Sequence, residues 1–97
     1  MYRSDLLQDK RVLVTGGGSG LGKSLGRRLL ELGADLSICG RRQDKLDATR
    51  AEFDADFPGR TATHVCDIRD AEAVEAMLDT IWRDGPLDAL VNNAAGN

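Results

Sequence analysis

The sequence predicts an α/β fold, in which a doubly wound parallel sheet carries helices on both faces in the order βαβαβαβ. Short runs rich in Val, Ile and Leu alternate along the chain with stretches whose apolar residues recur at helical spacing. Glycine and proline residues separate these runs, and no segment repeats another. Strands joined through helices are parallel, and their crossovers are right-handed.

The first half of the chain contains two strands with a helix between them. The first strand is expected at Arg11–Thr15, and Leu36–Cys39 forms the second. The helix begins near Leu21, and Gly33 follows its last turn as a stop signal. We expect its core-facing stripe to consist of Leu21, Leu25, Leu29 and Leu32.

The second half continues the alternation. The second helix ends at Pro58-Gly59, and its apolar face comprises Leu46, Phe53 and Phe57. Thr61–Cys66 is expected to be the third strand, and Leu87–Val91 the fourth. Asp70 caps the helix between them. The core-facing residues of that helix are expected to be Val74, Met77, Leu78, Ile81 and Trp82.

The order of the strands predicts where a ligand binds. In the Rossmann-type sheet that binds dinucleotides, the third, second, first and fourth strands lie side by side. The ligand crevice then opens between the first and fourth strands, where the order reverses. The loop after Thr15 and the run Asn92–Gly96 should therefore meet at one crevice.

A glycine-rich loop, Thr15–Gly22, follows the first strand. Glycines there let backbone N–H groups approach a phosphate closely, and the following helix N-terminus adds partial positive charge. The spacing is Gly16-x-x-x-Gly20-x-Gly22, which is neither G-x-G-x-x-G nor a Walker loop. The segment 10–30 contains no carboxylate, so we expect an anion to dock near its basic residues, Lys10, Arg11, Lys23, Arg27 and Arg28.

Composition excludes several classes of protein. The net charge of −3 and the pI near 5.0 argue against nucleic acid as a partner. No apolar run approaches the ~20 residues that span a bilayer, and the N-terminus has no signal core, so we expect no membrane association. Cys39 and Cys66 lack metal-binding or redox spacing, so they are expected to be buried, reduced thiols in a cytoplasmic protein without a metal site.

Three motifs together resemble the short-chain dehydrogenase/reductase family over essentially the whole chain. They are the glycine loop, Asp67 after the third strand and Asn92-Asn93-Ala94 after the fourth. Within the family, the triple glycine, the run Cys66–Asp70 and the ending Asn92–Asn97 resemble the 2,4-dienoyl-CoA reductases. Ala95 stands where most members have glycine. The resemblance implies an oxidoreductase that transfers a hydride to a small-molecule substrate, here an enoyl- or dienoyl-CoA thioester.

The motifs also suggest cofactor-binding residues. Gly16, Gly18 and Gly20 would form the pyrophosphate turn, with backbone N–H groups from Ser19 and Leu21, and Gly22 would let the helix pack on the sheet. The Ser19 hydroxyl would bind phosphate, cap the helix, or both. By resemblance, the Asp67 carboxylate would accept from the adenine amino group and the Ile68 backbone would lie against the ring; alternatively, Asp67 is a turn residue. Also by resemblance, the ribose and nicotinamide side would be lined by Asn93, Ala94 and Ala95, whereas Asn92 would tie the strand end to its neighbours.

The end of the second strand predicts the cofactor to be NADP. NAD sites usually carry an acid about twenty residues past the glycine loop, but here the strand runs into Gly40-Arg41-Arg42. The guanidinium groups of Arg41 and Arg42 can pair with a 2′-phosphate. The alternative is a solvated pair at the start of the second helix. Asp44 would compete as a ribose ligand or cap that helix.

Catalytic residues are not visible in residues 1–97. The one tyrosine, Tyr2, has Leu6 rather than lysine four positions later. The family's Tyr-x-x-x-Lys pair is expected beyond Asn97. We therefore interpret residues 1–97 as the N-terminal part of a single, truncated dinucleotide-binding domain. We expect this part to be inactive alone. The complete protein is expected to be a homo-oligomer.

Two other functions remain open at this point. The first is reduction of a 3-oxoacyl thioester or another ketone on the same scaffold. The second is a nucleotide-binding module without catalysis, which requires that the gene end at Asn97.

Overall fold

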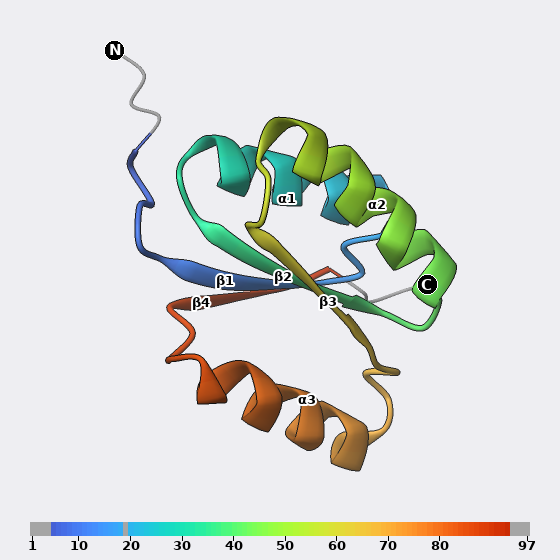
Figure 1. The fold of residues 1–97 in the computed structure, drawn as a ribbon. Coiled ribbons are helices and arrows are strands. Elements are labelled where there is room, and N and C mark those ends of the chain that lie inside the picture. The colour runs from blue at the N-terminus through green and yellow to red at the C-terminus, as the bar shows by residue number, and fades with distance from the viewer. Residues whose placement is uncertain (1–4, 19, 94–97) are drawn as a thin grey trace.

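The computed structural model describes residues 5–18 and 20–93. Their elements alternate as expected: β1 (Arg11–Thr15), α1 (Gly20–Glu31), β2 (Asp35–Gly40), α2 (Gln43–Asp56), β3 (Thr61–Val65), α3 (Ala71–Arg83) and β4 (Ala89–Asn92). Helices α1 and α2 cover one face of the sheet and α3 covers the other (Figure 1). No helix within the described ranges is both long and apolar enough to traverse a bilayer.

The sheet confirms the expected topology. Its order is β3-β2-β1-β4, and all three pairings are parallel. Thr15, the last residue of β1, lies in register with Cys39 of β2 and Asn92 of β4. The loops that leave β1, β2 and β4 therefore emerge at the same carboxyl edge.

Alternation along the strands divides the core into two clusters, because successive strand side chains point to opposite faces. On the α1–α2 face, β1 and β2 contribute Val12, Val14, Leu36 and Ile38, which pack with Leu30, Ala34, Leu46 and Phe53. On the α3 face the cluster consists of Leu13, Cys39, Cys66, Met77 and Ile81. Both cysteines are buried and free, and burial raises the pKa of the Cys39 thiol to about 11.

The expected leucine stripe of α1 is wrong at Leu21, whereas Leu29 does pack against the core. The Leu21 side chain is 66% exposed, and the buried residues of the helix are Gly22, Gly26 and Leu30. A Cβ at Gly26 would lie 3.0 Å from Leu36 Cδ2 and 3.3 Å from Phe53 Cε2. The helix thus approaches β2 and α2 more closely than large side chains allow, which a search for apolar residues misses.

Helix α3 matches its expected face except at Trp82. Met77 and Ile81 are buried, whereas the Trp82 side chain is 54% exposed, so the expectation of a core tryptophan is wrong. Trp82 follows Ile81 and is therefore rotated by about 100° around the helix axis, away from the sheet. The carboxylate of Asp70 accepts from the N–H groups of Glu72 and Ala73, which confirms the expected cap.

Three strands differ from their expected bounds. β2 is Asp35–Gly40 rather than Leu36–Cys39, β3 ends at Val65 rather than Cys66, and β4 is Ala89–Asn92 rather than Leu87–Val91. Before β4, the Asp88 carboxylate accepts from Arg11 N at 2.8 Å, and Asp88 N donates to Arg11 O at 2.8 Å. Leu87 packs on the α3-side cluster instead of extending the strand.

Candidate functional site

The glycine loop turns sharply between β1 and α1. Gly16 has φ +69° and Gly20 has φ +59°, left-handed conformations that favour glycine. Gly16 N donates to Cys39 O at 2.9 Å, which holds the start of the loop against β2. A Cβ at Gly17 would stand only 2.4 Å from Ile38 Cγ2. The first and second glycines are thus required by backbone conformation and by close packing.

Gly22 places the first turns of α1 against the loop itself. A Cβ at Gly22 would lie 2.2 Å from Gly16 O and 2.7 Å from Asn93 Nδ2. Packing of the helix on the sheet, the role expected of Gly22, belongs instead to Gly26 four residues later. The signal that sequence reasoning missed is the Gly22-x-x-x-Gly26 spacing, which puts both glycines on one side of the helix.

Thr15 joins the ends of β1 and β4. Its hydroxyl donates to Asn92 Oδ1 at 3.0 Å and accepts from Asn93 N at 2.8 Å. Asn92 therefore ties the strand end to its neighbour, as expected. These contacts bring the glycine loop and Asn93 to the two sides of the β1–β4 switch point, where ligands bind in sheets of this order.

Basic side chains of α1 do not supply the expected anion site. Lys23 forms an ion pair with Glu52 of α2, and Arg27 pairs with Asp56 at 2.8 Å. Arg28 pairs with Glu31 at 3.2 Å within the helix. The expectation that the basic side chains of α1 await an anion is wrong, because acids outside the segment, on α2 and at the end of α1, already pair with them.

The Arg11 side chain contacts the end of α3 instead of an anion site. Its guanidinium donates to Ile81 O at 3.0 Å and to Gly85 O, at the end of α3. Backbone N–H groups, including those in the first turn of α1 that lack intrahelical partners, would therefore be the main attraction for an anion at the loop.

The two arginines after β2 differ in their partners. Arg42 donates to both carboxylate oxygens of Asp44, from Nη2 at 2.8 Å and from Nε at 3.2 Å. This contact holds the pKa of Asp44 below its usual range. Arg42 stands at the N-cap of α2, and Asp44 lies in the first turn without capping the helix. Arg41 is exposed and forms no hydrogen bond or ion pair within the described ranges.

Asp67 combines a turn role with a charged contact. Its carboxylate accepts from Arg69 N at 3.0 Å and from the Arg69 guanidinium at 2.9 and 3.1 Å. These bonds, helped by the charge of Arg41, lower the pKa of Asp67 to about 2. Ile68 beside it is 36% exposed. Asp67 thus forms the turn into α3, and its remaining carboxylate lone pairs are available to a further donor.

Sequence reasoning missed Thr49. This residue is 2% exposed on the buried face of α2, and its hydroxyl donates to Gly18 O at 2.9 Å. The available signal was a polar residue between Leu46 and Phe53 on an otherwise apolar helix face.

Every described candidate lies at the carboxyl edge of the sheet. The loop residues Gly16, Gly18, Gly20 and Leu21 follow β1, whereas Arg41 and Arg42 follow β2. Asp67 and Ile68 follow β3, and Asn93 follows β4. Ser19, Ala94 and Ala95 lie outside the described residues. The described part of the chain contains no group of three His, Cys, Asp or Glu side chains placed to hold a metal ion.

The loop fits a pyrophosphate. Among the described residues beyond its chain neighbours and its own helix backbone, no heavy atom lies within 4 Å of the position that a Cβ would take at Gly20, so this side of the loop is open where α1 begins. Gly16 and Gly20 carry no side chain that would keep an anion from the backbone.

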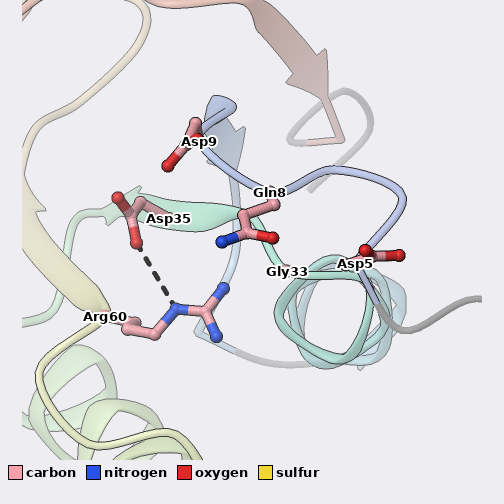
Figure 2. A pocket seen from close by; sticks show the side chains of 6 residues that line it. All are labelled: Asp5, Gln8, Asp9, Gly33, Asp35 and Arg60. Atoms are coloured by element: carbon pink, nitrogen blue, oxygen red, sulfur yellow. Dashed lines mark hydrogen bonds and ion pairs between the residues drawn. The ribbon is translucent and has the colours of Figure 1, made fainter.

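A separate pocket of about 390 Å³ lies at the amino edge of the sheet (Figure 2). It is lined by Asp5, Gln8, Asp9, Gly33, Asp35 and Arg60. Arg60 Nε lies 3.4 Å from Asp35 Oδ1, so its one cation faces an acid of the same pocket. The pocket is lined by more carboxylates than cations. The glycine loop lies at the opposite ends of the strands.

Comparison with known proteins shows the family to which the chain belongs. A family model described as short chain dehydrogenase matches residues 10–97. A probable 2,4-dienoyl-CoA reductase of Bacillus subtilis is 38% identical over 92 residues, which are 94% of this chain and 36% of the relative. The peroxisomal 2,4-dienoyl-CoA reductase of Danio rerio is 35% identical, over 100% of this chain and 33% of the relative. The chain thus spans about a third of the length of these relatives.

Solved structures show the same fold. The citronellol catabolism dehydrogenase of Pseudomonas aeruginosa superposes with a TM-score of 0.89 at 38% identity, covering 95% of this chain and 38% of the other. An actinorhodin polyketide ketoreductase solved with NADPH superposes with a TM-score of 0.81 at 34% identity, covering 88% and 33%. With its family model, relatives and strand order in agreement, the chain belongs to the short-chain dehydrogenase family of oxidoreductases.

Proposed function

We propose that residues 1–97 are the cofactor-binding part of a single dinucleotide-binding domain in an NADP-dependent reductase. The observation that carries the proposal is the meeting of the glycine loop and Asn93 at the β1–β4 switch point, joined through Thr15. Gly16, Gly18 and Gly20 would hold the pyrophosphate, with backbone N–H groups from Ser19 and Leu21. Asp67 and Ile68 would hold the adenine, and Asn93, Ala94 and Ala95 would line the ribose and nicotinamide.

The preference for NADP rests on Arg41. Its guanidinium is exposed at the end of β2 and is free of ion pairs within the described part of the chain. A hydrogen bond to a charged group contributes roughly 1.5–3 kcal/mol, which corresponds to about a tenfold to hundredfold preference. Arg42 contributes less because Asp44 already neutralises it. The relative crystallised with NADPH supports this choice.

For the substrate, we propose an enoyl- or dienoyl-CoA thioester. The support is the likeness to two relatives named 2,4-dienoyl-CoA reductases. The bound cofactor would supply the hydride, while the residues of this segment fix its position and leave the acid catalyst to the rest of the protein. Reduction of a ketone is the second candidate, favoured by the likeness to a polyketide ketoreductase. The free, buried Cys39 and Cys66 suit a reducing compartment, so we place the protein in the cytoplasm.

Two measurements on the full natural chain test these proposals. Calorimetric titration should give tighter binding of NADPH than of NADH; equal affinities would remove the role of Arg41. Loss of NADPH absorbance should follow addition of a 2,4-dienoyl-CoA, and a response to 3-oxoacyl-CoA alone would establish the ketone reductase instead. Residues 1–97 alone should give no turnover.

A further inference from the structure

Thr49 uses its hydroxyl differently from the other threonine in a helix. A threonine in a helix commonly bonds to the carbonyl four residues earlier, as Thr80 does with Ala76 O at 3.0 Å. Thr49, 2% exposed, instead reaches across to Gly18 O at 2.9 Å, 31 residues away. The one buried hydroxyl of α2 therefore donates its hydrogen bond to the glycine loop.

The contact belongs to a continuous support behind the loop. Gly16 N is bonded to Cys39 O, and Gly17 packs on Ile38 so closely that a Cβ would not fit. At Gly18, the Cβ position lies 3.6 Å from Lys45 Cβ and 3.7 Å from Leu46 Cδ2. Three successive glycines thus lie against β2 and α2, and the Gly18 carbonyl points toward α2.

The direction of that carbonyl matters for anion binding. A carbonyl oxygen that faces a phosphate repels it, whereas a backbone N–H attracts it. The Gly18 carbonyl belongs to the peptide bond that follows Gly18, a residue with no side chain to limit rotation of its backbone. The hydrogen bond from the Thr49 hydroxyl restrains this carbonyl and keeps its oxygen on the α2 side.

We propose that Thr49 is a positioning residue for phosphate binding, which it promotes by holding the Gly18 carbonyl away from the anion. This inference rests on the proposed dinucleotide-binding function. It predicts that Thr49 matters for the phosphates of a ligand and not for its nucleoside.

The test compares the affinities of ADP and adenosine on the full natural chain by calorimetry. Thr49→Val removes the donor at nearly constant shape, so ADP binding should weaken about three- to tenfold while adenosine binding stays unchanged. Thr49→Ser keeps the donor and should restore ADP binding. Thr80→Val makes the same chemical change on α3, where the hydroxyl serves only its own helix, and should alter neither affinity.

The possible results separate the two levels of inference. If the parent chain binds neither ADP nor NADPH, the proposed function fails, and the role of Thr49 fails with it. If the parent binds ADP and Thr49→Val binds it equally well, only the positioning role is overturned. The positioning role is also overturned if Thr49→Val weakens the binding of ADP and of adenosine by the same factor. It is overturned as well if Thr49→Ser binds ADP as weakly as Thr49→Val does. Thermal unfolding with and without ADP provides the same comparison should Thr49→Val be too unstable for calorimetry.

Discussion

The two faces of the sheet are packed by different means. On the α1–α2 face, the helix that follows the glycine loop turns Gly22 and Gly26 inward, and a buried hydroxyl contacts the loop. On the opposite face, α3 presents Met77 and Ile81 to Leu13 and the two cysteines. The first face combines close backbone approach at Gly22 and Gly26 with the larger apolar cluster, whereas the second is packed by side chains alone. Ligand binding should therefore respond to changes on the first face, whereas stability should respond to changes on both.

The largest effect on the binding face is expected from Gly22→Val. Its Cβ would stand 2.2 Å from Gly16 O, a backbone atom that cannot move without displacing the loop. Binding of NADPH should be abolished, as calorimetric titration of the full chain would report. Gly59→Val is a control for destabilisation: unlike Gly22, Gly59 has positive φ, so valine is strained there, but it lies in the turn before β3 with open space around it and should leave NADPH binding intact. Retained NADPH binding in Gly22→Val would place the site elsewhere.

On the opposite face, Ile81→Ala should lower the free energy of unfolding without changing the affinity for the cofactor. The side chain is 2% exposed, and truncation of a buried isoleucine typically costs about 2–5 kcal/mol. Denaturant unfolding gives the free energy, and titration of the folded variant gives the affinity. A matched loss of NADPH affinity would show that the two faces are not independent.

Arg41→Ala tests which of the two arginines after β2 binds the 2′-phosphate of NADPH. NADPH binding should weaken about tenfold to hundredfold, while NADH binding should stay constant, since only NADPH carries a 2′-phosphate. Arg42→Ala should have a smaller effect because Asp44 already neutralises Arg42. A reversal of the two effects in parallel titrations would assign the phosphate to Arg42.

Asp44→Asn should tighten NADPH binding by about two- to fivefold, because it frees a guanidinium that the carboxylate now holds. The expected change is small, since both side chains are well exposed. Unchanged or weaker NADPH binding in this variant would contradict the competition between Asp44 and the phosphate.

The smallest effect concerns acid stability. Folding lowers the pKa of Asp67 from 3.8 to about 2, so its ionised form is favoured in the folded state. The stabilisation is present above pH 3.8 and is lost as the pH falls toward 2. Asp67→Asn should flatten the pH dependence of thermal unfolding in that window alone. An unchanged acid slope would mean that the Arg69 contact does not persist in solution.

Much of the fold followed from the sequence, for a physical reason. Strand and helix periods, the Asp70 cap and the βα alternation are local or topological signals, and together they predicted the sheet order correctly. The sequence also predicted correctly that the end of β1, where the glycine loop starts, lies beside Asn92, because the topology brings the ends of β1 and β4 together.

The misses arose where contacts between distant segments decide the outcome. The basic residues of α1 were expected to attract an anion. Glu52 and Asp56 of α2, which are distant in sequence, pair with Lys23 and Arg27 instead. The apolar spacing of the α1 leucines predicted the core-facing side of the helix. That side includes Gly22 and Gly26 instead, because the helix lies too close to its neighbours for larger side chains. Thr49 and the pairing of Arg42 with Asp44 likewise depend on geometry that residue spacing does not reveal.

The contacts of Arg11 also bear on the order of folding. Its backbone N–H reaches Asp88, 77 residues away, and its guanidinium bonds to carbonyls at the end of α3. Contacts of such sequence separation pay a large loop-closure entropy and form slowly. During synthesis β1, β2 and the helix between them emerge before β4. The glycine loop can therefore form before β4 is available, and the docking of β4 onto β1 then brings Asn92 beside Thr15.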